Sequence, residues 1–240
     1  MEASNQVATV GVALERVYVW EIPVRLTHWV IFFSILILSA TGYYIAHPFI
    51  SVSGPAGQHF VMGTARAVHL YTAIIFGLAV LVRIYWLFAG NQYARLLQFI
   101  PLTRRRWGNL WDSILFFGFI TRRPAPYAGH DALAGAAYAF LMALYLILIA
   151  TGLALYTAIA AQSSPFQIFE FLVPVFGGLQ IARLIHHICM WLVLLTAIVH
   201  VYSVFLWSTV EHAGEVDSIF SGYKFFPKRG FFPKREARDS

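Results

Sequence analysis

Two histidines, His186 and His200, lie fourteen residues apart in one apolar stretch. No Asp, Glu, Lys or Arg occurs between Arg183 and Glu211, and a run of this length can cross a lipid bilayer as one α-helix. Fourteen residues make almost four helical turns, so both imidazoles share a face and lie about 21 Å apart along the axis. Two ligands at two depths suit two stacked metal centres, and ionisable residues inside a membrane indicate a functional site.

The composition is typical of a membrane protein. Hydrophobic residues make up 59% of the 240 residues and charged residues 12%, whereas soluble domains are about 25% charged. The single cysteine, Cys189, excludes an internal disulfide, a thiolate-held iron–sulfur cluster and an all-cysteine zinc site. The net charge of +6 comes from loops and the carboxy-terminal segment. We therefore attribute it to membrane topology and expect no nucleic-acid partner.

Four apolar segments predict an all-α integral membrane protein, a bundle of four transmembrane helices in one domain over residues 1–210. The predicted spans are about 26–46, 66–89, 131–157 and 180–208. Each has the roughly 20 residues that a crossing helix needs, and continuous apolarity of this kind suits helices only. The apolar stretch Phe166–Val175 is too short to span and is predicted to lie on the surface. Residues 1–20 lack the apolar core of a cleavable signal peptide, so the first span is expected to act as the insertion signal.

Basic residues predict the orientation of the bundle. Six arginines lie between spans two and three, and six lysines or arginines follow residue 220, whereas the other two connections are nearly uncharged. The positive-inside rule then places both termini in the cytoplasm, as an even number of spans requires. Residues 211–240 form a predicted cytoplasmic tail in which Phe225–Arg229 recurs as Phe231–Arg235. This repeat fits either a flexible tail or a segment resting on an anionic leaflet.

Depth sorts the membrane histidines into two pairs. With the amino terminus inside, His28 opens span one near the cytoplasmic face and His69 opens span two near the outer face. On span four, His186 is outer and His200 is inner. We therefore predict an outer pair, His69 with His186, and an inner pair, His28 with His200. His187 points about 100° away from His186 and is not predicted to be a ligand.

The fourteen-residue offset recurs from His28 to Gly42 and from His69 to Arg83. Glycine lets a flat macrocycle approach the backbone closely, and the cation of Arg83 suits its propionates through charge-assisted hydrogen bonds. Two alternatives stay open: Gly42 as a helix-packing residue, and Arg83 as a cation that snorkels to the inner interface.

These residues predict two bis-histidine haems in the core of the bundle. Arg66 and Arg183 lie near the outer level and suit the propionates of the outer haem. The sequence contains no Cys-x-x-Cys-His, so both haems are predicted to be non-covalent and of b type.

Several motifs resemble one known family, the b-type cytochrome subunit of membrane-bound nickel–iron hydrogenases. The resemblance covers roughly residues 18–223, and the motifs that carry it are Arg25–Trp29 with Thr41-Gly42, Arg183–His187 with Trp191 and His200, Arg83–Trp86 with Gly90-Asn91, and Ser221–Tyr223. It implies a di-haem cytochrome b in a bacterial cytoplasmic (inner) membrane. The small and large subunits of a nickel–iron hydrogenase would be its partners at the periplasmic face.

The resemblance also implies an electron path. Electrons from an iron–sulfur cluster of the small subunit would reach the outer haem, then the inner haem, then a quinone near the cytoplasmic side. The chain would be an electron-transfer subunit that breaks no substrate bond itself, although quinone reduction would occur on it. Asn91, Tyr93 and Tyr202 lie near the inner level and are candidates for the quinone site.

Two other functions remain open at this point. A di-haem subunit of a formate dehydrogenase or thiosulfate reductase would share the paired histidines. A transporter with a histidine proton relay belongs to a different class and predicts a colourless protein.

Overall fold

Four long apolar helices dominate the computed structural model, which describes residues 14–50, 60–96, 99, 104–118, 120–121, 132–211 and 215–227. These helices are α1 (Ile22–Ala46), α2 (Val61–Ala89), α4 (Ala132–Thr157) and α6 (Leu179–Glu211). Within the described residues, these four are long and apolar enough to cross a membrane. The predicted all-α, four-helix membrane architecture is therefore confirmed. Helices α1 and α2 begin before residues 26 and 66, because a helix can continue past the apolar part of its sequence.

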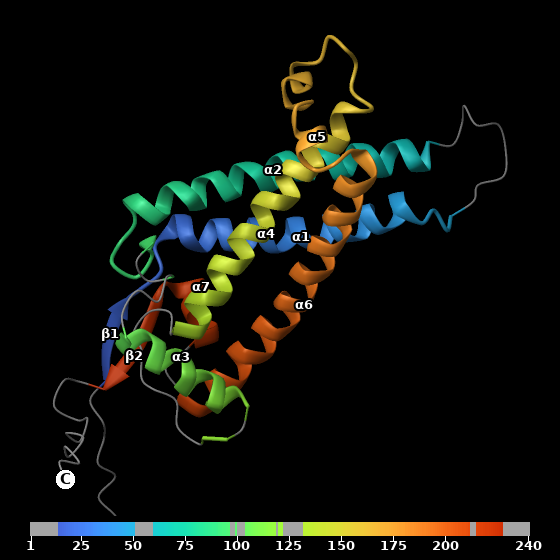
Figure 1. The fold of residues 1–240 in the computed structure, drawn as a ribbon. Coiled ribbons are helices and arrows are strands. Elements are labelled where there is room, and N and C mark those ends of the chain that lie inside the picture. Colours follow the sequence, from blue (N-terminus) through green and yellow to red (C-terminus); the bar gives the residue numbers. More distant parts are fainter. Residues whose placement is uncertain are drawn as a thin grey trace, which may run out of the picture.

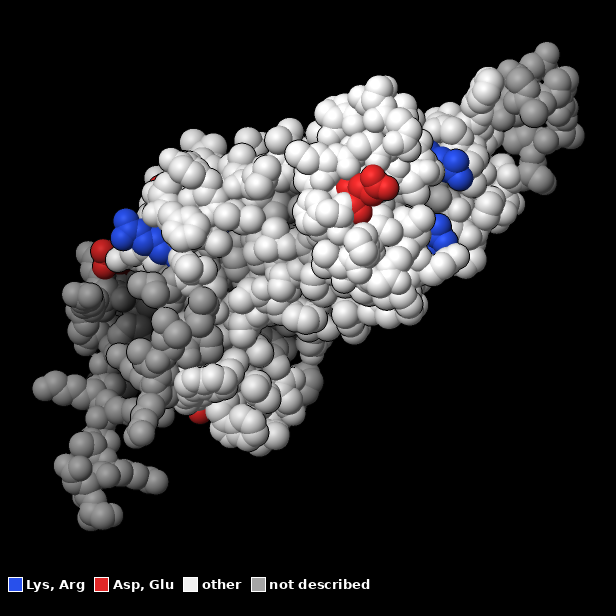
Figure 2. Space-filling model, turned by 45° about the horizontal axis from the view of Figure 1, so that its top comes forward, with Lys and Arg blue, Asp and Glu red and all other residues white. Residues whose placement is uncertain are grey.

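The helices form two antiparallel hairpins, α1 with α2 and α4 with α6, which cross one another (Figure 1). The core lies where the hairpins meet and includes Phe76, Val80, Tyr145 and Val193. Charged side chains gather towards the two ends of the bundle, and the surface between them is almost uncharged (Figure 2). Many large apolar side chains are exposed there, as expected where lipid rather than water covers a surface.

A short connection caps one end of the bundle, which we call the α5 end. The 3-10 helix η3 (Pro165–Phe169) and α5 (Leu172–Val175) make up this cap, and both contact α4. The Gln167 amide donates hydrogen bonds to the carbonyl oxygens of Thr157 and Ala160 at 3.1 Å. It therefore satisfies carbonyls that the end of α4 leaves without helical partners. The predicted short surface segment has become these two short helices.

The opposite end, the sheet end, contains a small sheet that the all-α prediction lacks. Strand β1 (Leu14–Tyr18) pairs antiparallel with β2 (Tyr223–Pro227), which follows the short helix α7 (Glu215–Ser221). The first copy of the Phe-Phe-Pro repeat therefore lies in a strand rather than in a free tail, and the second copy lies outside the described residues. Each strand pairs with a segment about two hundred residues away, and a short strand is not stable without such a partner.

A further helix, α3 (Arg104–Phe117), occupies part of the connection between α2 and α4. The sequence predicts no helix here, only an arginine-rich connection between two spans. The helix contacts α4, and its Trp107 and Trp111 are exposed. Because polar and apolar residues are interspersed along α3, this helix does not form a continuous apolar segment of the kind that predicts a span.

One carboxylate joins the beginning of α1 to the end of α2. Glu21 accepts hydrogen bonds from the Trp86 indole nitrogen and from the Asn91 backbone nitrogen, both at 2.8 Å. The Asn91 amide then donates to the Val19 carbonyl oxygen at 2.9 Å. These bonds fix α1 and α2 in one register and give Trp86 and Asn91 a structural role.

Glycine is required where the sheet returns to this junction. Gly222 has φ of +87°, a conformation that side chains disfavour. A Cβ atom there would lie 2.7 Å from the Trp20 carbonyl oxygen. The Gly222 carbonyl accepts from the Val19 nitrogen at 2.8 Å, and the Trp20 indole donates to the Ser218 hydroxyl at 3.1 Å. The carboxy-terminal segment is thereby anchored to the start of α1.

Replacing Glu21 tests this junction. Glu21→Ala leaves the Trp86 and Asn91 donors without their acceptor, and each lost partner costs about 1–3 kcal/mol. We expect a lower unfolding temperature in detergent for Glu21→Ala. Glu21→Gln retains a carbonyl oxygen and should stay near the parent protein. Equal unfolding temperatures for the alanine variant and the parent would contradict a stabilising junction.

Candidate functional site

Chemically distinctive side chains lie at two levels of the bundle, and each of the four long helices contributes one residue to each level. The α5-end level consists of Gly42, His69, Gly152 and His186, and the sheet-end level consists of His28, Arg83, Tyr138 and His200. On every helix the two residues are fourteen positions apart, which keeps them on one face.

At the sheet-end level, two histidines face each other across the hairpins. The ring centres of His28 (α1) and His200 (α6) are 6.4 Å apart. Two metal–nitrogen bonds of about 2 Å, plus about 1 Å from each nitrogen to its ring centre, would separate two imidazoles on one metal by about 6 Å. The observed separation therefore matches a shared axial metal. The His28 Nδ1 atom is buried without a hydrogen-bond partner among the described residues.

At the α5-end level, each histidine has a threonine partner on the neighbouring helix. The His69 Nδ1 atom lies 2.9 Å from the Thr41 hydroxyl oxygen, and the His186 Nδ1 atom lies 2.8 Å from the Thr151 hydroxyl oxygen. Both histidines are partly buried, and each is contacted by a hydroxyl on the other helix of its own hairpin. Their pairing with each other remains a prediction.

Glycines make room for these two imidazoles. A Cβ atom at Gly42 would lie 3.2 Å from His69 Cε1, and one at Gly152 would lie 3.4 Å from His186 Cε1. The sequence predicts that Gly42 leaves space for a macrocycle or serves helix packing. In the structure the glycine leaves space for the edge of the His69 ring, because α1 and α2 pack closely at this point.

Arg83 is buried, with 4% of its surface exposed. Its guanidinium carbon lies 4.9 Å from the Tyr138 ring centre and 5.6 Å from the Phe99 ring centre. Its Nη1 atom has no hydrogen-bond partner among the described residues. The side chain therefore does not snorkel to an interface, and a buried cation of this kind favours an anionic partner.

The remaining predicted site residues lie nearer the ends of the bundle. Arg66 and Arg183 are exposed near the α5 end, where Arg183 donates to the Gln180 side chain at 2.9 Å. Tyr93 packs at the sheet end beside Ala94, and Tyr202 is 50% exposed. The structure does not gather these residues around one site, and the Asn91 amide is engaged by the junction described above.

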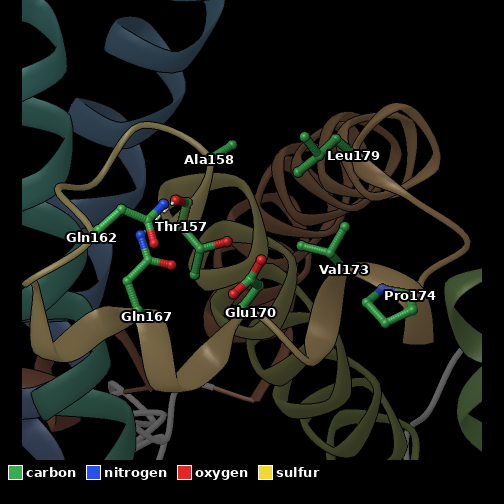
Figure 3. A pocket seen from close by; sticks show the side chains of 8 residues that line it. All are labelled: Thr157, Ala158, Gln162, Gln167, Glu170, Val173, Pro174 and Leu179. Atoms are coloured by element: carbon green, nitrogen blue, oxygen red, sulfur yellow. Dashed lines mark hydrogen bonds between the residues drawn. The ribbon is translucent and has the colours of Figure 1, made fainter.

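A cavity of about 280 Å³ opens at the α5 end between α4, the cap and α6 (Figure 3). Gln162, Gln167 and Glu170 contribute polar groups to it, and Val173, Pro174 and Leu179 contribute apolar ones. It has no histidine in its lining and is separate from the two levels.

Among the described residues, no group of three or more His, Cys, Asp or Glu side chains could hold a bare metal ion. The observed donors are instead imidazoles on the apolar helices, of which His28 and His200 lie with ring centres 6.4 Å apart. Haem iron takes its four equatorial nitrogens from the porphyrin and needs only axial ligands from the protein. Paired imidazoles therefore fit haem iron and do not suit a metal held by protein alone.

The sequence model of the prokaryotic cytochrome b561 family matches residues 19–222. The chain belongs to this family. It is 36% identical over 220 residues to a probable Ni/Fe-hydrogenase B-type cytochrome subunit of Cupriavidus necator, covering 90% of each chain. It is 35% identical over 214 residues to a probable Ni/Fe-hydrogenase 1 B-type cytochrome subunit of Escherichia coli K12, covering 86% of this chain and 90% of the relative.

A relative in Rhizobium leguminosarum with the same hydrogenase name as the Cupriavidus protein is 33% identical over 222 residues, covering 90% of this chain and 93% of that one. These similarities and the apolar helices identify a multi-pass membrane cytochrome b with a haem-based role in electron transport. The resemblance noted from the histidine motifs is confirmed.

Helix α4 contributes residues that are absent from the predicted site. Tyr138 and Gly152 show the same fourteen-residue offset as the site residues of the other helices, and Thr151-Gly152 repeats Thr41-Gly42. Both signals are present in the sequence, but α4 has no histidine from which the offset could be measured.

Enlarging Gly42 should remove haem. In Gly42→Val the new side chain would collide with the His69 ring, so we expect less bound haem per chain. Gly77→Val on α2 is the matched control, because a Cβ atom at Gly77 meets nothing within 4 Å. Haem content per folded chain, measured by absorbance, distinguishes the two variants. Equal haem content in both would contradict the ring-admitting role of Gly42.

Proposed function

We propose that this chain holds two haem b groups and carries electrons from a Ni/Fe-hydrogenase to the quinone pool. The sheet-end pair carries the proposal, because the separation of 6.4 Å between the His28 and His200 rings suits one iron between them. The second pair, His69 on α2 with His186 on α6, supports a second haem, since His186 lies fourteen residues from His200 on the same face of α6. The four histidines would be the axial ligands of the two irons.

Arginines at both levels would bind the carboxylates of the cofactors. Arg83 is the candidate for the sheet-end haem, since its buried guanidinium has donor capacity left over. Arg66 and Arg183 are candidates at the α5 end, where their exposed side chains can reach polar groups near the interface. Each haem would supply reversible one-electron chemistry at its iron. The protein would supply ligands, burial and hydrogen bonds that tune it.

An apolar layer separates the two levels. Ile35, Phe76, Tyr145 and Val193 each lie midway between the two site residues of their helix and belong to the same packed cluster. The Phe76 and Tyr145 rings meet edge to face, with centres 5.2 Å apart. This layer would exclude water between the haem sites, which are about 21 Å apart along the helices.

The charge distribution supports an orientation. Arg95, the arginines that begin α3 and Lys224 in β2 belong to the sheet end, so that end would be cytoplasmic. The α5 end would be periplasmic, and Glu170 is the one acid between α4 and α6. Connections this short hold no catalytic domain, so oxidation of hydrogen would take place on partner subunits docked at the α5 end. The hydrogenase names of the relatives favour this partner over a formate dehydrogenase or thiosulfate reductase.

Electrons would then cross from the α5 end to the sheet end. The iron–sulfur small subunit would deliver them, the large subunit would oxidise hydrogen, and quinone would accept them near the cytoplasmic side. Tyr93 and Tyr202 remain the candidates for contacting quinone. Asn91 is the weaker choice, since its amide already bonds to Val19, Tyr93 and Ala94.

Haem stoichiometry tests the ligand pairs. The parent protein should contain two non-covalent b haems per polypeptide by the pyridine haemochrome assay. His186→Ala should lose the α5-end haem, whereas His187→Ala should keep both, because the neighbouring side chain points about 100° away. A colourless but correctly folded parent protein would exclude the haem assignment.

The electron path can be tested in membranes that carry the complete complex. His200→Ala should remove the sheet-end haem and block hydrogen-dependent quinone reduction. Reduction of an artificial dye by the partner hydrogenase should continue, because its own clusters remain intact. Unchanged quinone reduction in a variant that spectroscopically lacks this haem would overturn the path.

A further inference from the structure

The two histidines at the α5-end level have the same surroundings on different hairpins. In each hairpin the first helix presents a Thr-Gly dipeptide, Thr41-Gly42 or Thr151-Gly152, to the histidine of the second helix. The hydroxyl contacts the imidazole Nδ1 atom at 2.9 or 2.8 Å, and the glycine lies under the Cε1 edge. Because the same threonine and glycine contacts occur in two separate helix pairs, we expect them to have the same role in both.

The bonding of the threonines determines which imidazole nitrogen carries hydrogen. A hydroxyl has one hydrogen to donate, and the closest backbone acceptors are the Ile37 carbonyl oxygen for Thr41 and the Ile147 carbonyl oxygen for Thr151, both at 2.7 Å. The hydroxyl oxygen must then accept from the imidazole. Each Nδ1 atom is therefore the N–H donor, and each Nε2 atom keeps the lone pair that binds a metal.

We infer that Thr41 and Thr151 are positioning residues that hold both α5-end ligands in the Nε2-binding form and lower the reduction potential of the haem between them. The inference rests on the proposed function. An Nδ1–H group that donates to an acceptor makes the imidazole a stronger electron donor. A stronger donor stabilises oxidised iron, and hydrogen bonding to ligands is one of the ways in which proteins set haem potentials.

The surroundings of the sheet-end level favour a higher reduction potential. The His28 Nδ1 atom has no hydrogen-bond partner among the described residues. The buried guanidinium of Arg83 lies at the same level, and a nearby cation favours the reduced, more negatively charged state of a haem. Both differences make the α5-end haem the lower-potential one. Electrons that enter at the α5 end would therefore move energetically downhill towards the sheet end.

A purely structural role for the threonines makes a different prediction. Threonine hydroxyls in helices often bond to the backbone one turn earlier, and Thr157 does so here, donating to the Ala154 carbonyl oxygen at 2.8 Å. If Thr41 and Thr151 did only this, removing their hydroxyls would change stability and leave haem potentials alone.

Redox titration of the full-length, haem-loaded protein distinguishes the two roles. Thr41→Val and Thr151→Val keep the side-chain shape and remove the hydroxyl. Each should raise the midpoint potential of the α5-end haem, and the double variant should raise it further. The sheet-end haem should not shift. The variants His186→Ala and His28→Ala each lack one haem, so they show which midpoint potential belongs to the α5-end haem and which to the sheet-end haem. Thr157→Val is the control on α4 and should leave both potentials unchanged.

Serine variants keep the test valid if a valine variant binds haem poorly. Thr41→Ser and Thr151→Ser retain the hydroxyl, so they should keep the haem, its potential and the electron paramagnetic resonance signal of the ferric form. Loss of haem in the serine variants as well would mean that side-chain size matters and would overturn the inference. So would haem-loaded valine variants with unchanged potentials. A parent protein without haem would instead reject the proposed function itself.

Discussion

The structure depends on satisfying polar side chains inside an apolar bundle. Lipid offers no hydrogen bonds, so an imidazole or guanidinium in the core needs a partner on a neighbouring helix or on a bound group. His69 and His186 find threonine hydroxyls, whereas the Nδ1 atom of His28 and the Nη1 atom of Arg83 have no such partner in the described part of the chain. The threonine contacts fix the orientation of the His69 and His186 rings within the protein. The polar atoms of His28 and Arg83 that lack such a contact favour a bound group as their partner.

The two hairpins follow one plan at the α5 end and diverge at the sheet end. Each hairpin presents a Thr-Gly dipeptide and a histidine at the first level. At the second level, α1 offers His28 where α4 offers Tyr138, and α6 offers His200 where α2 offers Arg83. The equivalent positions therefore hold one histidine pair and one cation–aromatic pair. This asymmetry would distinguish the two proposed haem sites chemically, although both levels use the same four helices and the same fourteen-residue spacing.

The four spans and the faces of their histidines could be predicted from the sequence. A bilayer admits continuous apolar helices, and the helical period then gives the face on which each residue lies. Continuous apolar segments define the helices, and the period puts His186 and His200 on one face. The pairing of β1 with β2 was not predictable, since it joins segments about two hundred residues apart and neither segment indicates which partner it will find. The contact of Gly42 with His69 depends on how closely α1 and α2 pack, which no single helix encodes. Helix α3 is amphipathic rather than apolar, so continuous apolarity does not predict it.

The junction at the sheet end connects stability with the site. Glu21 joins the start of α1 to Trp86 and Asn91 at the end of α2, and this fixes the relative register of the two helices. A shift of one residue would rotate a side chain by about 100° and move it by about 1.5 Å along the axis. Gly42 would then no longer lie under the His69 ring, and the Thr41 hydroxyl would lose its Nδ1 partner. The hydrogen bonds around Glu21 at the sheet end therefore help to keep Gly42 and Thr41 beside the His69 ring at the α5 end.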